Sequence, residues 1–412
     1  MWKGTILDDP AVNLVRTLTI ISIKMRRMNN LVTLFCAMFA FFFGSFITNM
    51  LSNIDKCPTQ KSGIDKMDPH PEIFLIILIL TAPLNQQRRQ AMRDTWLRLG
   101  QPLAQPYFPE NYVYLPQYNE RGFLQNQDIE EQAKSSSTFK NWMETVERKG
   151  DEEAAARRNM KVQHFFAIGT LNLDATLKRE LNSEHSQHKD LLMLPRLYDT
   201  YTNLTEKLLH ANDALTNHYS FSYMLKVDDD TYVKLDYVLN ELVSYDRKLM
   251  RKANEYRNQP LPELYWGYFN GRANIKTKGQ WRERDYFVAK HYVTYALGGG
   301  YIISRRIAEF IETNTHHLST YVSEDVSMGI WLAPLRHVYR RHDVRFDTGY
   351  MPRTCRSHHL VLHKRNVTQF RDLYAGKLCT FEVRQEQQLR RPAEYFYDWL
   401  KPADKCCDTK AI

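Results

Sequence analysis

The chain has 412 residues, of which 43% are hydrophobic and 25% are charged. This composition excludes an intrinsically disordered protein and provides enough apolar residues for one large domain or two ordinary ones. The formal net charge is +9, but the basic residues are spread among aromatic and acidic ones. Without basic blocks, this charge argues against nucleic acid as a partner and suits smaller anionic ones such as sugar nucleotides.

The N-terminal part predicts a membrane anchor. Residues 31–50 carry no charge over about twenty positions, the length that crosses a bilayer. Lys24, Arg26 and Arg27 precede this run. By the positive-inside rule, residues 1–30 form a cytoplasmic tail, 31–50 a single-pass type II signal anchor, and the remainder is lumenal. The alternative is a cleaved secretory signal, which sends the body of the chain into the same pathway.

Two further features agree with a lumenal body. Asn203 and Asn366 begin N-glycosylation sequons. Five cysteines follow the anchor, where thiols oxidise, and no cysteine or histidine spacing typical of zinc is present. We therefore expect disulfides, with Cys57 as the odd residue that stays free or pairs between chains. The other four cysteines of this part are Cys355, Cys379, Cys406 and Cys407.

Residues 72–412 are expected to form one lumenal domain, which a polar stem at residues 51–71 holds off the membrane. A stretch at about 101–159, rich in Gln, Glu, Lys and Ser, interrupts the domain. It is interpreted as a solvated, partly helical insertion. The alternative is an element that docks the acceptor.

The rest of the domain alternates strand and helix patterns. Ile73–Leu80 is a continuous apolar run, which predicts a strand buried on both faces. The alternation as a whole predicts an α/β fold with a mainly parallel, twisted sheet flanked by helices. The other early strands are expected at 161–168 and 221–227, and helices at 85–99, 174–185, 201–218 and 234–257.

An acidic triplet, Asp228 to Asp230, follows the strand at 221–227. At period 2, Asp228 and Asp230 leave the strand end on one side and Asp229 on the other. Two carboxylates can then converge on one hard cation that holds a diphosphate. The alternative is a solvated turn or a helix N-cap. The offsets of an EF-hand calcium loop are absent.

Two later segments also carry chemical signals. Gly298–Gly300 lie within an expected strand at 295–304, and three successive glycines are costly unless the backbone approaches another group closely or adopts a positive φ. Glu324 and Asp325 open an amphipathic helix. They are interpreted either as functional carboxylates or as an acidic first turn.

Taken together, these segments resemble the β-1,3-glycosyltransferase family, glycosyltransferase family 31, over about residues 72–400. Five motifs match in order, and this order is more specific than any one of them. The stretch at 101–159 departs from the family pattern, which puts accessory contacts in doubt but not the reaction. The motifs are RRQAMRDTW at 88–96, YTNLTEK at 201–207, the aspartate triplet, GGGY at 298–301 and EDV at 324–326.

The resemblance implies a glycosyltransferase A-type fold and inverting transfer of galactose from UDP-galactose to the 3-hydroxyl of a galactose acceptor. Asp228, Asp230 and His363 would bind Mn²⁺, with Mg²⁺ as the alternative. For His363 alone, a satisfied core or surface histidine is the rival interpretation. Asp325 would be the catalytic base, and Glu324 is the alternative base.

Other residues are expected to bind the substrates. Asp229 would contact the ribose, and Arg88 and Arg93 would neutralise the nucleotide or close the first helix against the sheet. Surface ion pairing is the alternative for the intervening Arg89. Core packing is the rival interpretation for each aromatic residue. The expected substrate contacts are Trp266, Tyr268, Gly299, Tyr301 and Glu324.

A closer match within the family is to the branch that adds the second galactose of the glycosaminoglycan linkage region. It implies a galactosyl-xylosyl acceptor on proteoglycan core proteins, a Golgi membrane location and association with other Golgi glycosyltransferases. The alternatives are another donor such as UDP-N-acetylglucosamine, another acceptor, or a noncatalytic lumenal chaperone or glycan-binding protein on the same scaffold. The match is carried by residues 265–272, 295–304, 323–334 and 345–348 and by Cys406 and Cys407.

Overall fold

The chain divides into two units, Met1–Met67 and Asp68–Ile412. No helix among the described residues is both long and apolar enough to cross a membrane. The expected tail, stem and insertion lie outside the described residues, as does most of the expected anchor. The computed structural model describes residues 38–39, 42–43, 73–100, 160–255, 261–351, 355, 359–377, 395 and 397–407, without the side chains of 250–255 and 404.

The second unit is built on a seven-stranded sheet with the strand order β3-β2-β1-β4-β7-β6-β8. Four of its six strand pairings are parallel, and only β7 runs antiparallel to its neighbours. The mixed α/β fold with a mostly parallel sheet confirms the expected class. The strands are β1 (Ile73–Leu80), β2 (Val162–Gly169), β3 (Leu191–Leu194), β4 (Phe221–Asp228), β6 (Glu263–Asn270), β7 (Tyr295–Ser304) and β8 (Val338–His342).

A second, three-stranded sheet has the order β5-β10-β9. Its strands are only two residues long, so no period could reveal them in the sequence. They are β5 (Tyr232–Val233), β9 (Phe346–Asp347) and β10 (Val361–Leu362).

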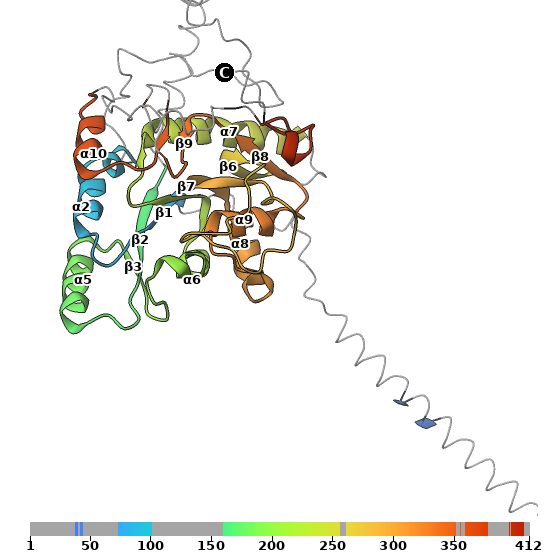
Figure 1. Cartoon of the computed structure of the whole chain (residues 1–412), viewed down its shortest axis with the longest axis horizontal. Coiled ribbons are helices and arrows are strands. Elements are labelled where there is room, and N and C mark those ends of the chain that lie inside the picture. The colour runs from blue at the N-terminus through green and yellow to red at the C-terminus, as the bar shows by residue number, and fades with distance from the viewer. Residues whose placement is uncertain are drawn as a thin grey trace, which may run out of the picture. The chain divides into compact units, whose positions relative to one another are not determined.

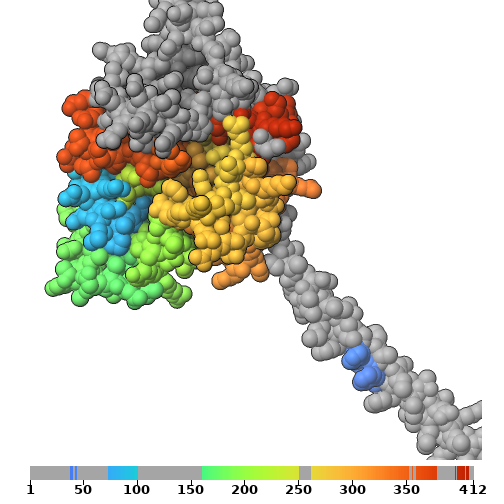
Figure 2. Space-filling view, in the orientation of Figure 1, coloured from blue at the N-terminus to red at the C-terminus, as the bar shows by residue number. Residues whose placement is uncertain are grey.

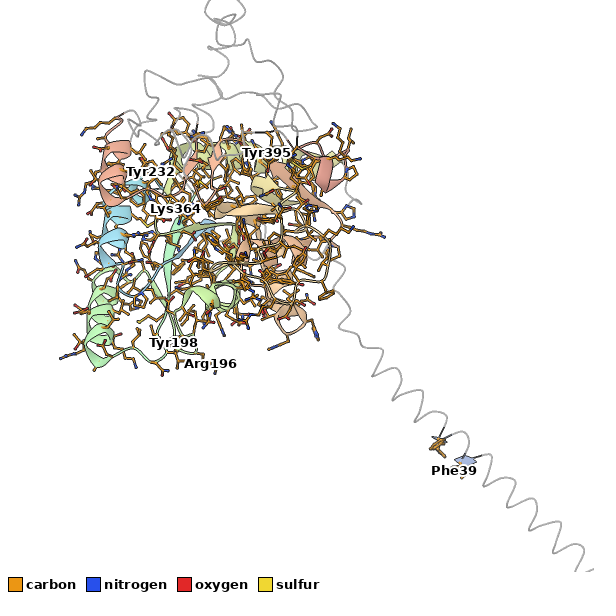
Figure 3. All side chains as sticks on the ribbon, viewed as in Figure 1. Phe39, Arg196, Tyr198, Tyr232, Lys364 and Tyr395 are labelled. Carbon is orange, nitrogen blue, oxygen red and sulfur yellow. A yellow bond between two sulfur atoms is a disulfide. The ribbon has the colours of Figure 1, made fainter. Side chains whose placement is uncertain are left out.

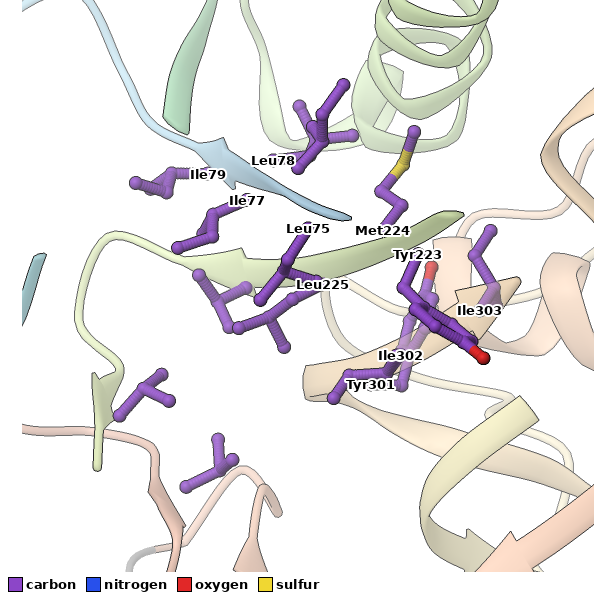
Figure 4. Packing of buried hydrophobic residues seen from close by; sticks show 14 of the residues in the cluster. Leu75, Ile77, Leu78, Ile79, Tyr223, Met224, Leu225, Tyr301, Ile302 and Ile303 are labelled. Carbon is purple, nitrogen blue, oxygen red and sulfur yellow. The ribbon is translucent and has the colours of Figure 1, made fainter. Parts of the chain in front are cut away.

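Strand β1 lies inside the large sheet, third in the strand order, and all eight of its residues are buried. It pairs in parallel with β2 on one side and with β4 on the other. Figure 4 shows its side chains packed with those of β4 and β7. The register aligns Leu80, the last residue of β1, with Asp228, the last of β4. The strand that anchors the core therefore also fixes where the acidic triplet begins.

Helices cover both faces of the sheet. Helices α6 and α8 pack together on one face, and α7 lies over the other (Figure 1). The chain leaves its helical conformation at Thr95, where φ is −120° and ψ is −112°, so the helix expected to reach residue 99 ends early and a 3₁₀ turn follows. The α-helices are α2 (Gln86–Asp94), α5 (Ala175–His188), α6 (Leu204–His218), α7 (Leu235–Glu255), α8 (Arg305–Asn314), α9 (Glu324–Leu332) and α10 (Val367–Tyr374).

The four-residue strand β3 and helix α8 were not predicted from the sequence. The helix expected from residue 201 begins as a 3₁₀ turn, η2 (Tyr201–Asn203), before α6. The other 3₁₀ turns are η1 (Trp96–Gly100), η3 (Thr315–His317) and η4 (Ala403–Lys405).

The disulfides expected near the C-terminus are partly described. Cys406 and Cys407 bond to each other, and the segment that carries them bridges to Tyr397. Cys355 is also disulfide-bonded. Cys57 and Cys379 lie outside the described residues.

The two sequons differ in their surroundings. Asn366 is exposed and caps α10 through a reciprocal pair of hydrogen bonds with Gln369. Asn203 is half-buried and donates from Nδ2 to the Tyr198 carbonyl at 3.0 Å. The Thr205 hydroxyl is buried and donates to the Tyr321 carbonyl. Of the two, Asn366 offers the more open position for a glycan.

A buried ion network joins α2 to α5. Arg89 donates to both carboxylate oxygens of Glu184, at 2.8 and 2.7 Å, and Arg93 donates to Glu184 at 2.7 Å and to Asp190 at 2.8 Å. Burial alone would raise the pKa of Asp190, but His164 and Arg93 hold it well below its usual range. Arg89 is fully buried, so the alternative interpretation of surface ion pairing is wrong for this residue.

We expect Glu184→Gln to lower the free energy of unfolding by about 3–5 kcal/mol, because it leaves Arg89 buried without its partner charge. Denaturant unfolding monitored by circular dichroism measures the change. Glu180→Gln, at an exposed position of the same helix, is the control and should change stability by no more than about 0.5 kcal/mol. Equal midpoints for the two variants would contradict the interpretation that the network stabilises the fold.

Candidate functional site

A cavity of about 440 Å³ opens beyond the carboxyl ends of β1 and β4. Ligands of open parallel sheets bind at this edge. Most of the predicted site residues line the cavity, and Arg93 and the three predicted aromatic residues do not. The predicted residues present are Arg88, Asp228, Asp229, Asp230, Gly299, Glu324, Asp325 and His363.

Asp228, Asp230 and His363 converge within this cavity. The Nε2 atom of His363 lies 3.0 Å from Asp230 Oδ1 and 3.3 Å from Asp228 Oδ2. One potential ligand atom from each of the three residues lies within 4.8 Å of the other two. Asp228 ends β4, and His363 directly follows β10. The backbone amide of His363 donates a hydrogen bond to the Asp347 carbonyl, which fixes the position of the histidine. The small sheet therefore brings His363 to the triplet.

The donor set fits a divalent cation. His363 Nδ1 donates to the Gly349 carbonyl at 2.9 Å, which leaves Nε2 directed at the two carboxylates. Nε2 and Asp230 Oδ1 are buried and face each other, and neither has another hydrogen-bond partner among the described residues. Burial lowers the pKa of His363, but Asp228 and Asp230 outweigh it and raise the pKa to about 9. The carboxylates therefore require a positive charge here, and two oxygens with one imidazole suit Mn²⁺ or Mg²⁺.

The glycine run makes room for this site. A Cβ on Gly299 would lie 2.5 Å from the ring of His363, and one on Gly298 would lie 3.0 Å from Asp325 Oδ2. A Cβ on Gly300 would lie 2.9 Å from Val361. Of the two reasons expected for three glycines, the structure shows close approach, since none of them has a positive φ.

Asp229 points to the other side of the strand end, as its position in the alternation predicts. It accepts hydrogen bonds from Thr81 at 2.6 Å, Asn85 at 2.7 Å and Arg88 at 2.8 Å. Arg88 also lies 3.8 Å from Asp230 and keeps 44% of its side chain exposed. The Arg88 guanidinium can therefore also pair with an anion in the cavity.

Lys226 is a site residue that the sequence reasoning missed. Its ammonium group is buried and donates to Asp228 Oδ1 at 3.0 Å and to the Gly298 carbonyl at 2.6 Å, and it also pairs with Glu324. Burial would lower the pKa of Lys226, but the charges of Asp228 and Glu324 raise it. Because Lys226 lies two residues before Asp228, the strand period already placed both on one face.

Glu324 and Asp325 lie in the first turn of α9 and line the same cavity. Asp325 accepts from Gly298 N at 2.8 Å and from Val326 N at 2.9 Å. Burial raises the pKa of Asp325 to about 6 against the opposing effects of Lys226 and these amides. Burial likewise raises the pKa of Glu324 to about 8, opposed by Lys226. Asp325 can therefore accept a proton near neutral pH.

The three predicted aromatic platforms are buried outside the cavity. Trp266 donates from Nε1 to Asp343 at 2.9 Å, with the Arg341 guanidinium 4.3 Å from the ring centroid. Tyr268 packs against Tyr395, and Tyr301 stands edge-on to Tyr265. Core packing, the rival interpretation, describes all three.

Arg93 is also absent from the cavity, because the network with Glu184 and Asp190 holds its side chain elsewhere. Other aromatic residues line the cavity in place of the predicted ones. They are Tyr201, Trp281, Tyr292, Tyr295 and Tyr350. Tyr201 is the first residue of the YTNLTEK motif, so the motif could have indicated that it lies at the site. No sequence pattern indicated this for Trp281 or Tyr350.

We expect Lys226→Met to lower the free energy of unfolding by about 3–5 kcal/mol, because Asp228 and Glu324 lose their shared buried cation. Lys364→Met is the control. Lys364, labelled in Figure 3, likewise pairs with a carboxylate of the triplet, that of Asp230, but its side chain is 42% exposed. This substitution should cost less than about 1 kcal/mol. The double variant K226M/E324Q should lose less than the sum of its single changes. Denaturant unfolding without added metal measures K226M, E324Q, the double variant and K364M, and a wild-type midpoint for K226M would contradict the assignment.

Comparison with known proteins identifies the family. A family model described as Galactosyltransferase matches residues 138–342. Beta-1,3-galactosyltransferase 6 of Mus musculus is 34% identical over 347 residues, which cover 83% of this chain and 85% of that protein. The human UDP-GalNAc:beta-1,3-N-acetylgalactosaminyltransferase 2 is 34% identical over 155 residues, 38% of this chain and 28% of that protein.

A likeness to a solved structure, that of HddC from Yersinia pseudotuberculosis, covers 65% of this chain and 91% of that one at 12% identity. Its TM-score of 0.23 is too low to support an argument. The similarity to the murine enzyme extends over most of both chains. The chain therefore belongs to the galactosyltransferase family, glycosyltransferase family 31.

Proposed function

We propose that this hexosyltransferase is an inverting β-1,3-galactosyltransferase that transfers galactose from UDP-galactose to the 3-hydroxyl of a galactose acceptor. One observation carries the proposal: the cluster of Asp228, Asp230 and His363 shares one cavity with Asp325. One cavity thus offers a site for the diphosphate of the donor and a carboxylate for the proton of the acceptor hydroxyl. The similarity to beta-1,3-galactosyltransferase 6 supports galactose as the transferred sugar.

The reaction needs one displacement at the anomeric carbon. The acceptor oxygen forms a bond to C1 of galactose as the bond from C1 to the phosphate oxygen breaks on the opposite face, so the configuration inverts and UDP leaves. Asp325 takes the proton of the acceptor hydroxyl. Its two hydrogen bonds from backbone amides hold the carboxylate in one orientation. Glu324 is less suited because it is paired with Lys226.

Asp228, Asp230 and His363 would hold the metal ion, Mn²⁺ or Mg²⁺, which when bound neutralises charge on the departing diphosphate. Arg88 adds a second positive charge beside Asp230. Asp229 remains the proposed ribose contact, and its hydrogen bonds with Thr81, Asn85 and Arg88 fix its position. Gly299 contributes by leaving space for the His363 ring.

The cellular setting is part of the same proposal. Residues 1–30 form the cytoplasmic tail, 31–50 the signal anchor and 51–71 the stem of a type II Golgi membrane protein whose catalytic domain has a glycosyltransferase A-type fold. The acceptor is the galactosyl-xylosyl end of the proteoglycan linkage tetrasaccharide, to which the enzyme adds the second galactose. The supporting observations are the uncharged run at 31–50 and the similarity to beta-1,3-galactosyltransferase 6. Association with other Golgi glycosyltransferases accords with this setting.

A second donor class is favoured by one observation, the 34% identity to an N-acetylgalactosaminyltransferase over the shorter match. The donor is therefore tested directly. The purified full-length protein is incubated with UDP-galactose, UDP-N-acetylgalactosamine or UDP-N-acetylglucosamine and a galactosyl-xyloside, with and without Mn²⁺, and the product linkage is analysed. A β-1,3-linked galactose is expected. Exclusive use of an N-acetylhexosamine donor, or no transfer from any donor, would overturn the proposal.

Asp230→Asn is expected to lower galactose transfer at least about 100-fold, because the substitution removes one of two carboxylate charges from the cation site. Isothermal titration calorimetry with Mn²⁺ and UDP should show a matching loss of metal affinity. Folding should be unaffected by circular dichroism. Asp213→Asn, at an exposed position on α6, is the control and should behave as wild type. Normal transfer by D230N would remove Asp230 from the metal site.

Asp325→Asn is expected to lower kcat by about 10²–10⁴-fold while leaving the affinity for UDP unchanged, because the amide cannot accept the hydroxyl proton. In the wild type, the raised pKa of Asp325, about 6, predicts that transfer falls as the pH drops through 6 and the base becomes protonated. Initial rates between pH 5 and 8 measure this limb, with an acid-stable readout of released UDP. Full activity of D325N would move the role of base to another residue.

A further inference from the structure

Three aromatic side chains gather where the cavity opens to solvent. Tyr201 is 45% exposed and Tyr350 is 57% exposed, and both contact Trp281 edge-on, with ring centroids 6.2 and 5.9 Å apart. The Trp281 indole donates its hydrogen bond to the Tyr201 hydroxyl. We call these three residues the aromatic rim. All three line the cavity that holds the metal cluster and Asp325.

The rim is tied to the proton acceptor. Trp281 belongs to the segment between β6 and β7, which forms part of the surface shown in gold in Figure 2. Two residues later, Glu283 accepts hydrogen bonds from the amides of Val322 at 3.0 Å and Ser323 at 3.3 Å. Ser323 directly precedes α9, which carries Asp325. The loop and the catalytic helix are therefore held in one arrangement.

The rim is also tied to the metal cluster. Tyr350 follows Gly349, whose carbonyl accepts the hydrogen bond from His363. Burial raises the pKa of the Tyr201 hydroxyl against the opposing hydrogen bond with Trp281, and the charges of Asp228, Asp325 and Glu324 raise it further. The three rings therefore line the same cavity as the carboxylates of Asp228, Glu324 and Asp325.

We infer that Tyr201, Trp281 and Tyr350 bind the acceptor sugar, with Trp281 stacking on the apolar face of the terminal hexose while its hydroxyl edge turns toward Asp325. This inference rests on the proposed function and assigns a substrate to one part of its site. A pyranose exposes C–H groups on one face and hydroxyls at its edge, so an aromatic ring beside carboxylates matches both features. Arg88 and the metal cluster line the same cavity and suit the charged diphosphate of the donor rather than a sugar face.

The position of the rim favours the acceptor over the donor hexose. A donor anchored by its diphosphate places its sugar between the cluster and Asp325, in the interior of the cavity. The acceptor hydroxyl has to reach Asp325 from outside, so the acceptor sugar lies between Asp325 and the solvent, where Tyr201 and Tyr350 are exposed. The aromatic residues that the sequence predicts as sugar platforms, such as Trp266, are buried and cannot contact the acceptor.

The test compares Trp281→Ala with wild type in full-length protein, using UDP-galactose, Mn²⁺ and a galactosyl-xyloside at varied concentrations. The acceptor KM should rise at least about tenfold, while the KM for UDP-galactose and the calorimetric affinity for UDP stay within about twofold. Trp281→Phe keeps a ring and should restore most of the acceptor affinity. Tyr350→Ala should raise the acceptor KM in the same direction.

Phe287→Ala is the matched control, because Phe287 lies in the same loop, is 84% exposed and does not line the cavity. It should leave both KM values unchanged. An unchanged acceptor KM in W281A, or a rise only in the KM for UDP-galactose, would overturn the inference. If wild-type protein transfers no galactose, the proposed function itself fails, and the two outcomes are distinct because the wild type is measured in every assay.

Discussion

The buried ammonium group of Lys226 connects the two halves of the site. It contacts Asp228 at the end of β4, the Gly298 carbonyl on β7 and the Glu324 carboxylate at the start of α9. The amide of the same Gly298 donates to Asp325. One lysine thus neutralises acidic groups from two elements and fixes the peptide that orients the proposed base. Such clusters are stable only when every charge has a partner, because an unpaired buried charge is costly.

Close backbone approach is the second constraint. The metal cluster draws its histidine from beyond β10, and His363 reaches Asp228 and Asp230 only by passing over Gly299. The small sheet makes this possible by holding Val361 and Leu362, which directly precede the histidine, between β5 and β9. The glycine run and the small sheet therefore serve one purpose, which is to seat an imidazole beside a strand end that already carries two carboxylates.

Much of the fold followed from local pattern. The continuous apolar run of β1 predicted a strand buried on both faces, and the acidic triplet divided as its period of two required. The long, regular elements were found for this reason. Short strands such as β3 and β9 were not predicted, because two to four residues are too few to show a period and their pairing partners are distant in the sequence. Arginine spacing on α2 likewise did not show which guanidinium would face the cavity and which would be buried.

The sequence by itself determined the fold class, the family and the positions of the charged motifs, because these depend on short-range periods and on residue order. Only the tertiary structure decided which aromatic residues are available to a ligand. Trp266 and Trp281 are both tryptophans, yet the first is buried in the sheet against Asp343 and the second lines the cavity. That difference depends on which surfaces the other strands and loops cover. No local pattern contains this information, since burial is a property of contacts between residues far apart in the chain.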